Sequence, residues 1–396
     1  MSIEPPSSGN DRPVTLSKPA PSVPPASADA SPELGLPADD NRFESEPQEA
    51  LDDTDLPAGW TVARATEDDV VDLTALLRRH ETRGRGWASS SEDDVLVAVS
   101  GVRTRENLLI RDADGVARGW VSAHDRAAGR MLTTFAVDRE LPADDADRCA
   151  RVLLAWCDAQ ACAVGESRGV ATQQIDATAF ADDHRHQQWL AEAGYRRVRS
   201  WWQMVRPVVP EDAELAPTPG DRGVVVRRVR REGGHESGTM PDATDLHTVH
   251  DVLEAAFADH FNSHEESFDE FVHRLREDPG HRWDHWWLAE IVDGEGGADA
   301  PEPAGALVGT WLTGADDTPD GSFVAYIGVL ENARGRGVAK ALLRTIIADA
   351  AERGRNRVGL EVDADSPTGA HELYVNLGWE TKYVTESWHK DVPVRP

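Results

Sequence analysis

The sequence predicts a mixed α/β protein made of two tandem copies of one unit, each a mixed sheet flanked by helices. Three observations lead to this prediction. Apolar runs of strand length alternate with amphipathic helical patterns along most of the 396 residues. The same order of elements recurs on both sides of a Pro-, Glu- and Asp-rich segment at 207–222. A chain of this length can also bury two cores. We therefore expect domains at 57–206 and 223–396, joined by that linker.

The N-terminal segment 1–56 differs in composition from the rest of the chain. It is rich in Pro, Ser, Ala, Asp and Glu, and Phe43 is its one aromatic residue. Such a segment cannot bury enough apolar surface to offset the entropy lost on ordering. We expect a disordered acidic tail.

The first copy begins with a strand and an amphipathic helix, whose apolar side carries Val70, Leu73 and Leu77 and whose N-cap is Thr66. The turn at 112–115 has the sequence Asp-Ala-Asp-Gly, which favours a hairpin. The expected elements are, in order, a strand at 60–64, a helix at 67–80, strands at 107–111, 117–124 and 131–137, a helix at 144–162, a strand at 173–177, a short helix ending at Gly194 and a strand at 196–205.

The second copy repeats this order. Its first helix is marked by Leu246, Val249 and Leu253, and its last helix ends at Gly378, a typical helix C-cap. The expected elements are a strand at 224–229, helices around 246–257 and 268–275, a hairpin of 286–292 with 304–312, a strand at 323–329, a helix at 338–350, a strand at 358–362, a helix at 369–377 and a strand at 382–388.

The net charge of the chain limits its partners. A formal charge of −30 would repel nucleic acid and anionic membranes over most of the surface. The three cysteines, Cys149, Cys157 and Cys162, fall in one helical region and suit a reducing compartment, where we expect them to be core residues. There is no signal-peptide pattern and no long apolar run. We expect a cytoplasmic monomer or homodimer that binds neither nucleic acid nor membrane.

Against this acidic background, the cationic, glycine-bearing turn at 334–339 is distinctive. Its sequence, Arg-Gly-Arg-Gly-Val-Ala, joins the strand at 323–329 to the helix at 338–350. A turn of this kind directs backbone N–H groups outward at the positive end of the helix dipole. It therefore predicts an anion site, most plausibly for a pyrophosphate.

Three other interpretations of this turn were weighed. A Walker loop requires Gly-Lys-Ser/Thr at the helix start, whereas Ala339-Lys340-Ala341 stands there. A dinucleotide fingerprint requires a third glycine where Lys340 stands, and a βα unit instead of the preceding hairpin. A plain surface turn would leave both arginines unexplained. The pyrophosphate site is favoured over all three.

Two motifs resemble the GNAT superfamily of acetyl-CoA-dependent acyltransferases. Arg334, Gly337 and Ala339 fit the family turn Q/R-x-x-G-x-G/A, and residues 373–379, Leu-Tyr-Val-Asn-Leu-Gly-Trp, fit its closing helix motif. Tyr374 follows Arg334 by 40 positions, with a strand between them. The resemblance covers 224–390 well and 60–206 only by architecture. The C-terminal half is similar to that of tandem GNAT proteins of the mycothiol synthase type. The resemblance implies two tandem GNAT-like acyl-CoA N-acyltransferase domains.

The resemblance implies an N-acetyltransferase that moves an acetyl group from acetyl-CoA to an amine of a small molecule, without a metal. Tyr374 would protonate the leaving thiolate, and backbone N–H groups near Val329 would stabilise the oxyanion. The residues implied to hold acetyl-CoA are Gly328, Val329, Leu330, Arg334, Gly335, Arg336, Gly337, Val338, Ala339, Lys340 and Ser366.

The general base is the least defined part of the predicted site. Glu361 lies on the opposite strand face from Leu360 and Val362, so it is a candidate. Other candidates for a proton relay are His260, His264 and Glu265. His247 and His250 lie at helical spacing, as do His260 and His264, but no third ligand is evident, so no metal site is predicted.

The first copy carries acidic residues where the second has its turn, namely Asp138, Glu140, Asp144, Asp145 and Asp147. These carboxylates would repel a pyrophosphate, so we expect the first copy to perform no chemistry. The main alternative for the whole chain is a non-catalytic acyl-CoA-binding or scaffold protein with the same fold. A dinucleotide-binding oxidoreductase is a more distant one.

Overall fold

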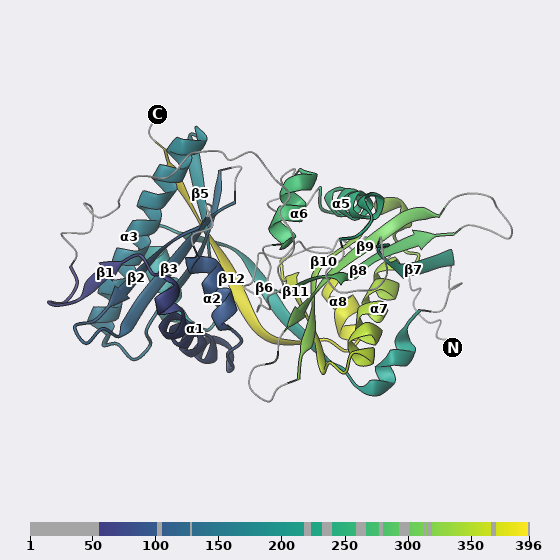
Figure 1. Cartoon of the computed structure of the whole chain (residues 1–396), viewed down its shortest axis with the longest axis horizontal. Coiled ribbons are helices and arrows are strands. Elements are labelled where there is room, and N and C mark those ends of the chain that lie inside the picture. The colour runs from purple at the N-terminus through teal and green to yellow at the C-terminus, as the bar shows by residue number, and fades with distance from the viewer. Residues whose placement is uncertain are drawn as a thin grey trace, which may run out of the picture.

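The computed structural model describes residues 55–100, 105–126, 129–217, 223–231, 240–258, 267–276, 280–292, 301–312, 314, 319–365 and 370–394. Figure 1 shows two lobes, the N-terminal half in purple to teal and the C-terminal half in green to yellow. Within the described ranges, no helix is both long and apolar enough to cross a membrane.

The N-terminal half contains the expected elements and one more helix, α2, which sequence periodicity did not predict. Its elements are β1 (Thr61–Ala63), α1 (Val70–Arg85), α2 (Glu92–Val99), β2 (Arg105–Arg111), β3 (Ala117–Asp125), β4 (Arg130–Val137), α3 (Ala143–Arg168), β5 (Thr172–Phe180), α4 (His184–Glu192) and β6 (Arg196–Pro207). α3 runs past the expected end at residue 162. It ends only where Gly169 adopts a left-handed conformation, φ 64°.

The C-terminal half follows the same order. The 3-10 segment η3 (Pro210–Leu215) lies in the expected linker, before β7 (Val224–Arg228). The remaining elements are α5 (Ala243–Phe257), α6 (Phe268–Arg276), β8 (His281–Ile291), β9 (Glu302–Leu312), β10 (Gly321–Val329), η5 (Glu331–Ala333), α7 (Val338–Glu352), β11 (Arg357–Asp363), α8 (Ala370–Asn376) and β12 (Glu380–Pro393). β8 and β9 pair antiparallel, which confirms the predicted hairpin.

All the strands form one continuous sheet, in the order β1-β2-β3-β4-β5-β12-β6-β11-β10-β9-β8-β7. The two closing strands are exchanged between the halves. β12, the last strand of the chain, pairs with β5, while β6 pairs with β11. In Figure 1 the yellow β12 and the teal β6 cross at the centre of the molecule. Each half therefore depends on a strand from the other, which the order of elements in the sequence does not reveal.

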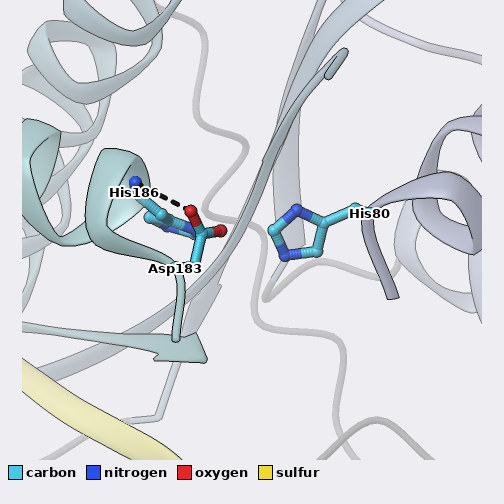
Figure 2. Close-up of side chains that lie close together, drawn as sticks. All are labelled: His80, Asp183 and His186. Atoms are coloured by element: carbon cyan, nitrogen blue, oxygen red, sulfur yellow. Dashed lines mark hydrogen bonds and ion pairs between the residues drawn. The ribbon is translucent and has the colours of Figure 1, made fainter. Parts of the chain in front are cut away.

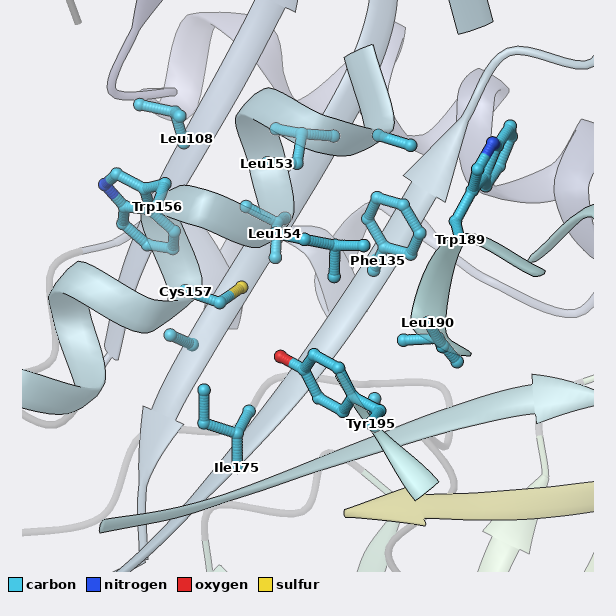
Figure 3. Packing of buried hydrophobic residues seen from close by; sticks show 14 of the residues in the cluster. Leu108, Phe135, Leu153, Leu154, Trp156, Cys157, Ile175, Trp189, Leu190 and Tyr195 are labelled. Atoms are coloured by element: carbon cyan, nitrogen blue, oxygen red, sulfur yellow. The ribbon is translucent and has the colours of Figure 1, made fainter. Parts of the chain in front are cut away.

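Helices cover both faces of this sheet in each half. In the N-terminal half α1 and α2 pack on one face, around Leu73 and Trp120, and α3 and α4 pack on the other. Figure 3 shows the second of these cores, where Cys157 lies among Leu153, Ile175 and other apolar side chains. Cys149 and Cys157 are buried, as predicted for core residues. In the C-terminal half α5 and α6 share a core separate from that of α7 and α8.

Each half contains one pair of parallel strands that separate partway along. β10 pairs with β11 from Ser322 to Val324, opposite Val358 to Leu360, and the pairing stops there. β4 and β5 pair in the same way, up to Thr133 opposite Ala177. Beyond these points the two strands of each pair are no longer paired with each other, and we call this unpaired stretch the gap. Unpaired strand edges can bind a ligand.

Gly328 in β10 allows α5 to approach the sheet closely. A Cβ at this position would lie 2.8 Å from the Ala256 Cβ and 3.1 Å from the Leu253 Cδ2. We expect Gly328→Ala to destabilise the fold by about 1–3 kcal/mol through overpacking. Thermal unfolding should show a lower Tm for this variant, and an unchanged Tm would contradict the packing described here.

Candidate active site

The turn after β10 has the backbone geometry of an anion cradle. Gly335 and Gly337 both have positive φ, 76° and 84°, and Gly337 is the N-cap of α7. A Cβ on either residue would have no atom within 4 Å, so both glycines border open space. This conformation is strained for other residues. It lets the chain turn sharply from η5 into α7.

The first amides of α7 precede the hydrogen-bonded ladder of the helix. Ala341 N donates to Gly337 O at 3.0 Å, which is the start of that ladder. The N–H groups of Val338, Ala339 and Lys340 therefore lie in the turn that has no intrahelical acceptors. Val338 is buried and anchors the helix, whereas Lys340 is exposed. This is the arrangement that favours a phosphate group at a helix N-terminus.

The two arginines of the turn differ in their surroundings. Arg334 is half-buried, and its Nε is buried without a hydrogen-bond partner. Arg336 extends toward the start of β7, where one guanidinium nitrogen lies 3.6 Å from the position of a Cβ on Gly223. Arg334 is therefore the better placed of the two for a ligand in the turn.

Glu361 lies at the apex of the gap between β10 and β11. It follows Leu360, the last residue of β11 that pairs with β10. On β10 the register shifts between Val324 and Tyr326, so a bulge marks the same level. A bulge locally redirects a strand and disrupts its ladder. The apex thus combines a carboxylate with an irregular strand edge.

The Glu361 side chain is buried and has a polar neighbour on the next strand. It is 8% exposed and accepts a hydrogen bond from Gln203 Nε2. Gln203 also donates to Thr385 Oγ1 at 3.0 Å. Glu361 lines a cavity of about 150 Å³ that extends under α1, with Arg85, Tyr383 and other residues of both halves in its wall.

Tyr374 lies on the other face of the sheet. It is 2% exposed, belongs to the core under α7 and α8, and its ring meets that of Trp379 edge-on at 6.0 Å. Burial raises the pKa of its phenol above the usual value, so the hydroxyl stays protonated at neutral pH. Leu360 and Val362 point into this same core, so Glu361, between them, faces the opposite side.

For several other residues singled out in the sequence, the structure, within the ranges that it describes, shows no contact with Glu361, Tyr374 or the turn at 334–339. Ser366, His260, His264 and Glu265 lie outside the described residues. His247 stacks on Phe268 at 3.7 Å, so packing between α5 and α6 accounts for its position.

The N-terminal half has other residues at the positions of the gap and turn described above. Thr178 follows the last residue of β5 that pairs with β4, as Glu361 follows the last residue of β11 that pairs with β10. The N-cap of α3 is Pro142, whereas the N-cap of α7 is Gly337. Of the five predicted carboxylates, Asp138 is buried and paired with Arg118 at 2.7 Å, and Asp147 accepts from the Trp189 indole at 2.7 Å. These two carboxylates serve internal contacts.

Aromatic side chains gather where β4 and β5 have separated, and His80, Phe135 and Phe180 among them line the cavity of about 150 Å³. The Phe135 and His186 rings meet edge-on with their centroids 4.8 Å apart, and the His80 ring lies 5.5 Å from that of His186 and 5.4 Å from that of Phe180. Arg139 pairs with Asp183 nearby, with one hydrogen bond of 2.8 Å. Sequence analysis missed this cluster because its members come from distant segments.

Comparison with known proteins agrees with the site geometry. Residues 249–379, which include both the turn and Tyr374, match the model of the acetyltransferase (GNAT) family. The chain is 30% identical over 279 residues to the mycothiol acetyltransferase of Salinispora arenicola, covering 69% of this chain and 78% of that relative. It is 29% identical over 216 residues to the mycothiol acetyltransferase of Salinispora tropica, covering 54% and 62%.

Solved structures share the fold at lower identity. A GCN5-related N-acetyltransferase from Sphaerobacter thermophilus superposes with a TM-score of 0.65 at 20% identity, covering 85% of this chain and 97% of the other. A tandem GNAT protein from the clavulanic acid biosynthesis pathway gives a TM-score of 0.61 at 14% identity, covering 85% and 100%. These likenesses confirm the predicted fold class, a mixed α/β tandem GNAT architecture.

Proposed function

We propose that this chain, which belongs to the GNAT acetyltransferase family, transfers an acetyl group from acetyl-CoA to an amine of a small molecule. We place the chemistry in its C-terminal half. The observation that carries the proposal is the gap between β10 and β11, which has an anion cradle at its mouth and Glu361 at its apex. The N-terminal half has Thr178 and Pro142 at the positions of Glu361 and Gly337, which supports a single working site.

Acetyl-CoA would bind with its pyrophosphate on the turn. The amides of Val338, Ala339 and Lys340 and the Arg334 guanidinium supply donors there. The edge of β10 near Gly328 and Val329 would pair with the amides of the pantetheine arm. β10 and β11 are not paired at this level, so that edge faces the gap.

Acid and base would act from opposite faces of the sheet. β10 and β11 are not paired beyond Leu360, so a thioester lying between them would be reached from both faces. Glu361 would accept a proton from the amine as it attacks the thioester carbon. A backbone N–H near Val329 would stabilise the oxyanion, and the Tyr374 phenol would protonate the departing thiolate.

The acceptor would approach through the cavity beside Glu361. Its volume of about 150 Å³ suits the amine-bearing end of a molecule, with the remainder extending outward. Mycothiol is the compound in the names of the two relatives, which are mycothiol acetyltransferases. Its unacetylated precursor therefore belongs in any panel of acceptors.

The direct test is CoA release from acetyl-CoA by the purified chain with a panel of small amines. We expect release that depends on the amine, together with an acetylated amine detected by mass spectrometry. Acetyl-CoA binding without turnover on any amine, unchanged by Tyr374→Phe, would instead indicate a non-catalytic acyl-CoA-binding protein.

Arg334→Ala should raise the KM for acetyl-CoA by about 10- to 100-fold and leave kcat much less affected. A charge-assisted bond to phosphate contributes about 1.5–3 kcal/mol, and the pyrophosphate lies far from the reacting atoms. The matched control is Arg336→Ala, which should raise KM less because that guanidinium lies beside Gly223. Steady-state kinetics over a range of acetyl-CoA concentrations would measure both. Equal effects of the two variants would contradict the assignment of Arg334.

A further inference from the structure

Three side chains meet where β4 and β5 have separated, and one of them, His80, also lines the cavity beside Glu361. Figure 2 shows His80 approaching from α1 on one side and Asp183 and His186 from the start of α4 on the other. Asp183 is the N-cap of α4 and accepts from the backbone N–H of His186 at 3.1 Å. One donor atom of each side chain lies within 4.8 Å of the other two.

His186 is buried and His80 is half-buried, and both imidazoles are incompletely hydrogen-bonded. His186 is 2% exposed and Asp183 5% exposed. His80 Nδ1 and His186 Nε2 are buried and have no hydrogen-bond partner. Buried polar atoms are nearly always paired, so two such nitrogens in one cluster require an explanation.

Both histidines favour the neutral form. Burial lowers the pKa of His80 to about 3, with Arg139 and Arg85 adding to the effect. Burial, His80 and Arg139 also lower the pKa of His186. A neutral imidazole carries a lone pair on one ring nitrogen, which is the form that coordinates metals.

We propose that His80, His186 and Asp183 bind one divalent transition-metal ion, with zinc as the best match. Two imidazoles and a carboxylate are a common zinc donor set, with bonds of about 2.0–2.2 Å. A tetrahedral site of that size places donor atoms about 3.4 Å apart. The side chains must therefore close in by about 1 Å, which rotation about their side-chain bonds allows. This assignment departs from the sequence analysis, which predicts no metal.

The site has a route for the ion and room for a water ligand. His80 lines the cavity of about 150 Å³, and Asp183 lines a second cavity of about 410 Å³. The cluster lies between the two. Water from either cavity can complete the coordination shell.

The Arg139 guanidinium competes with a metal ion for the Asp183 carboxylate. It donates to Asp183 Oδ1 at 2.8 Å and pairs with the other carboxylate oxygen. A dication beside a guanidinium in a buried place is unfavourable, so Arg139 must withdraw when the metal binds. The 410 Å³ cavity, which Arg139 itself lines, provides the space. Metal binding thus exchanges one positive partner of Asp183 for another.

The metal would act as a structural link. α1 and α4 cover opposite faces of the sheet, and the three side chains meet through the gap between β4 and β5. A bound ion would tie these helices together and stabilise the half that we propose performs no chemistry.

The test uses the full chain without an affinity tag, stripped by a chelator and titrated with zinc by calorimetry. Cobalt is the spectroscopic probe. We expect one equivalent of zinc, a tetrahedral Co²⁺ absorption band and a higher Tm in zinc. His80→Ala and His186→Ala should each weaken zinc binding at least about tenfold. His184→Ala is the matched control, an exposed histidine on the same helix that should bind like the wild type.

Arg139→Gln provides a test in the opposite direction, because removing the competitor should tighten zinc binding. Misfolding of a variant can weaken zinc binding but cannot tighten it, so a gain of affinity in Arg139→Gln is not explained by misfolding. The proposal is overturned if the wild-type chain takes up no zinc. It is equally overturned if His184→Ala lowers affinity as much as His186→Ala, or if the cobalt complex is octahedral as in water.

Discussion

Tyr374→Phe should lower kcat by about 10²- to 10⁴-fold and leave the KM for acetyl-CoA nearly unchanged. Loss of a general acid has an effect of this size, whereas the phenyl ring that packs against Trp379 is retained. Because burial raises the pKa of Tyr374, the phenol keeps its proton as the pH rises through the alkaline range. The kcat of the wild type should therefore show no alkaline loss until the pH passes that raised pKa.

The control for this variant is Tyr195→Phe. Tyr195 is also buried, 4% exposed, but it lies in the core of the N-terminal half, and its hydroxyl has no hydrogen-bond partner. Removing that hydroxyl should leave kcat unchanged. Initial rates of CoA release with saturating amine would compare the variants. If Tyr374→Phe keeps full activity, the leaving thiolate takes its proton from another source.

Glu361→Gln should lower kcat by about 10²-fold or more near neutral pH, because glutamine cannot accept a proton from the amine. The defect should shrink as the pH rises, since an amine that is already deprotonated in solution needs no base. A purely structural role for Glu361 would instead give a loss that does not vary with pH. The ratio of wild-type to variant kcat across a pH series distinguishes the two.

Glu386→Gln is the matched control for the loss of a carboxylate. Glu386 lies on β12, next to β6, and pairs with Arg197 at 3.2 Å, away from the cavity wall. Its replacement should leave kcat and its pH profile unchanged. Should both carboxylate variants lose activity equally at every pH, the assignment of the base to Glu361 fails.

The sequence was sufficient for the features that depend on local pattern. Periodicity located most helices and strands, and the hairpin of β8 and β9 is confirmed. The turn at 334–339 was legible because glycines at positive φ and the start of a helix are adjacent in the chain. α2 was missed because an eight-residue helix gives too few turns for a periodic signal.

The sequence could not reveal contacts between distant segments. His247 and His250 lie at helical spacing, but no third ligand was evident for a metal, and in the structure His247 stacks on Phe268. Asp183 and His186 are equally close in sequence, but His80, the third member of their cluster, lies about a hundred residues away. Spacing along one helix does not say what lies opposite it.

By itself, the sequence determined the kind of unit, its duplication, and the anion cradle of the second copy. Each of these follows from residues that are neighbours in the chain, where backbone conformation and helix capping act. Only the tertiary structure decided the exchange of β6 and β12, the cluster of His80, Asp183 and His186, and the place of Glu361 just beyond the last paired residues of β10 and β11. These depend on strand pairing and side-chain packing across the sheet, which bring together residues that no local pattern relates.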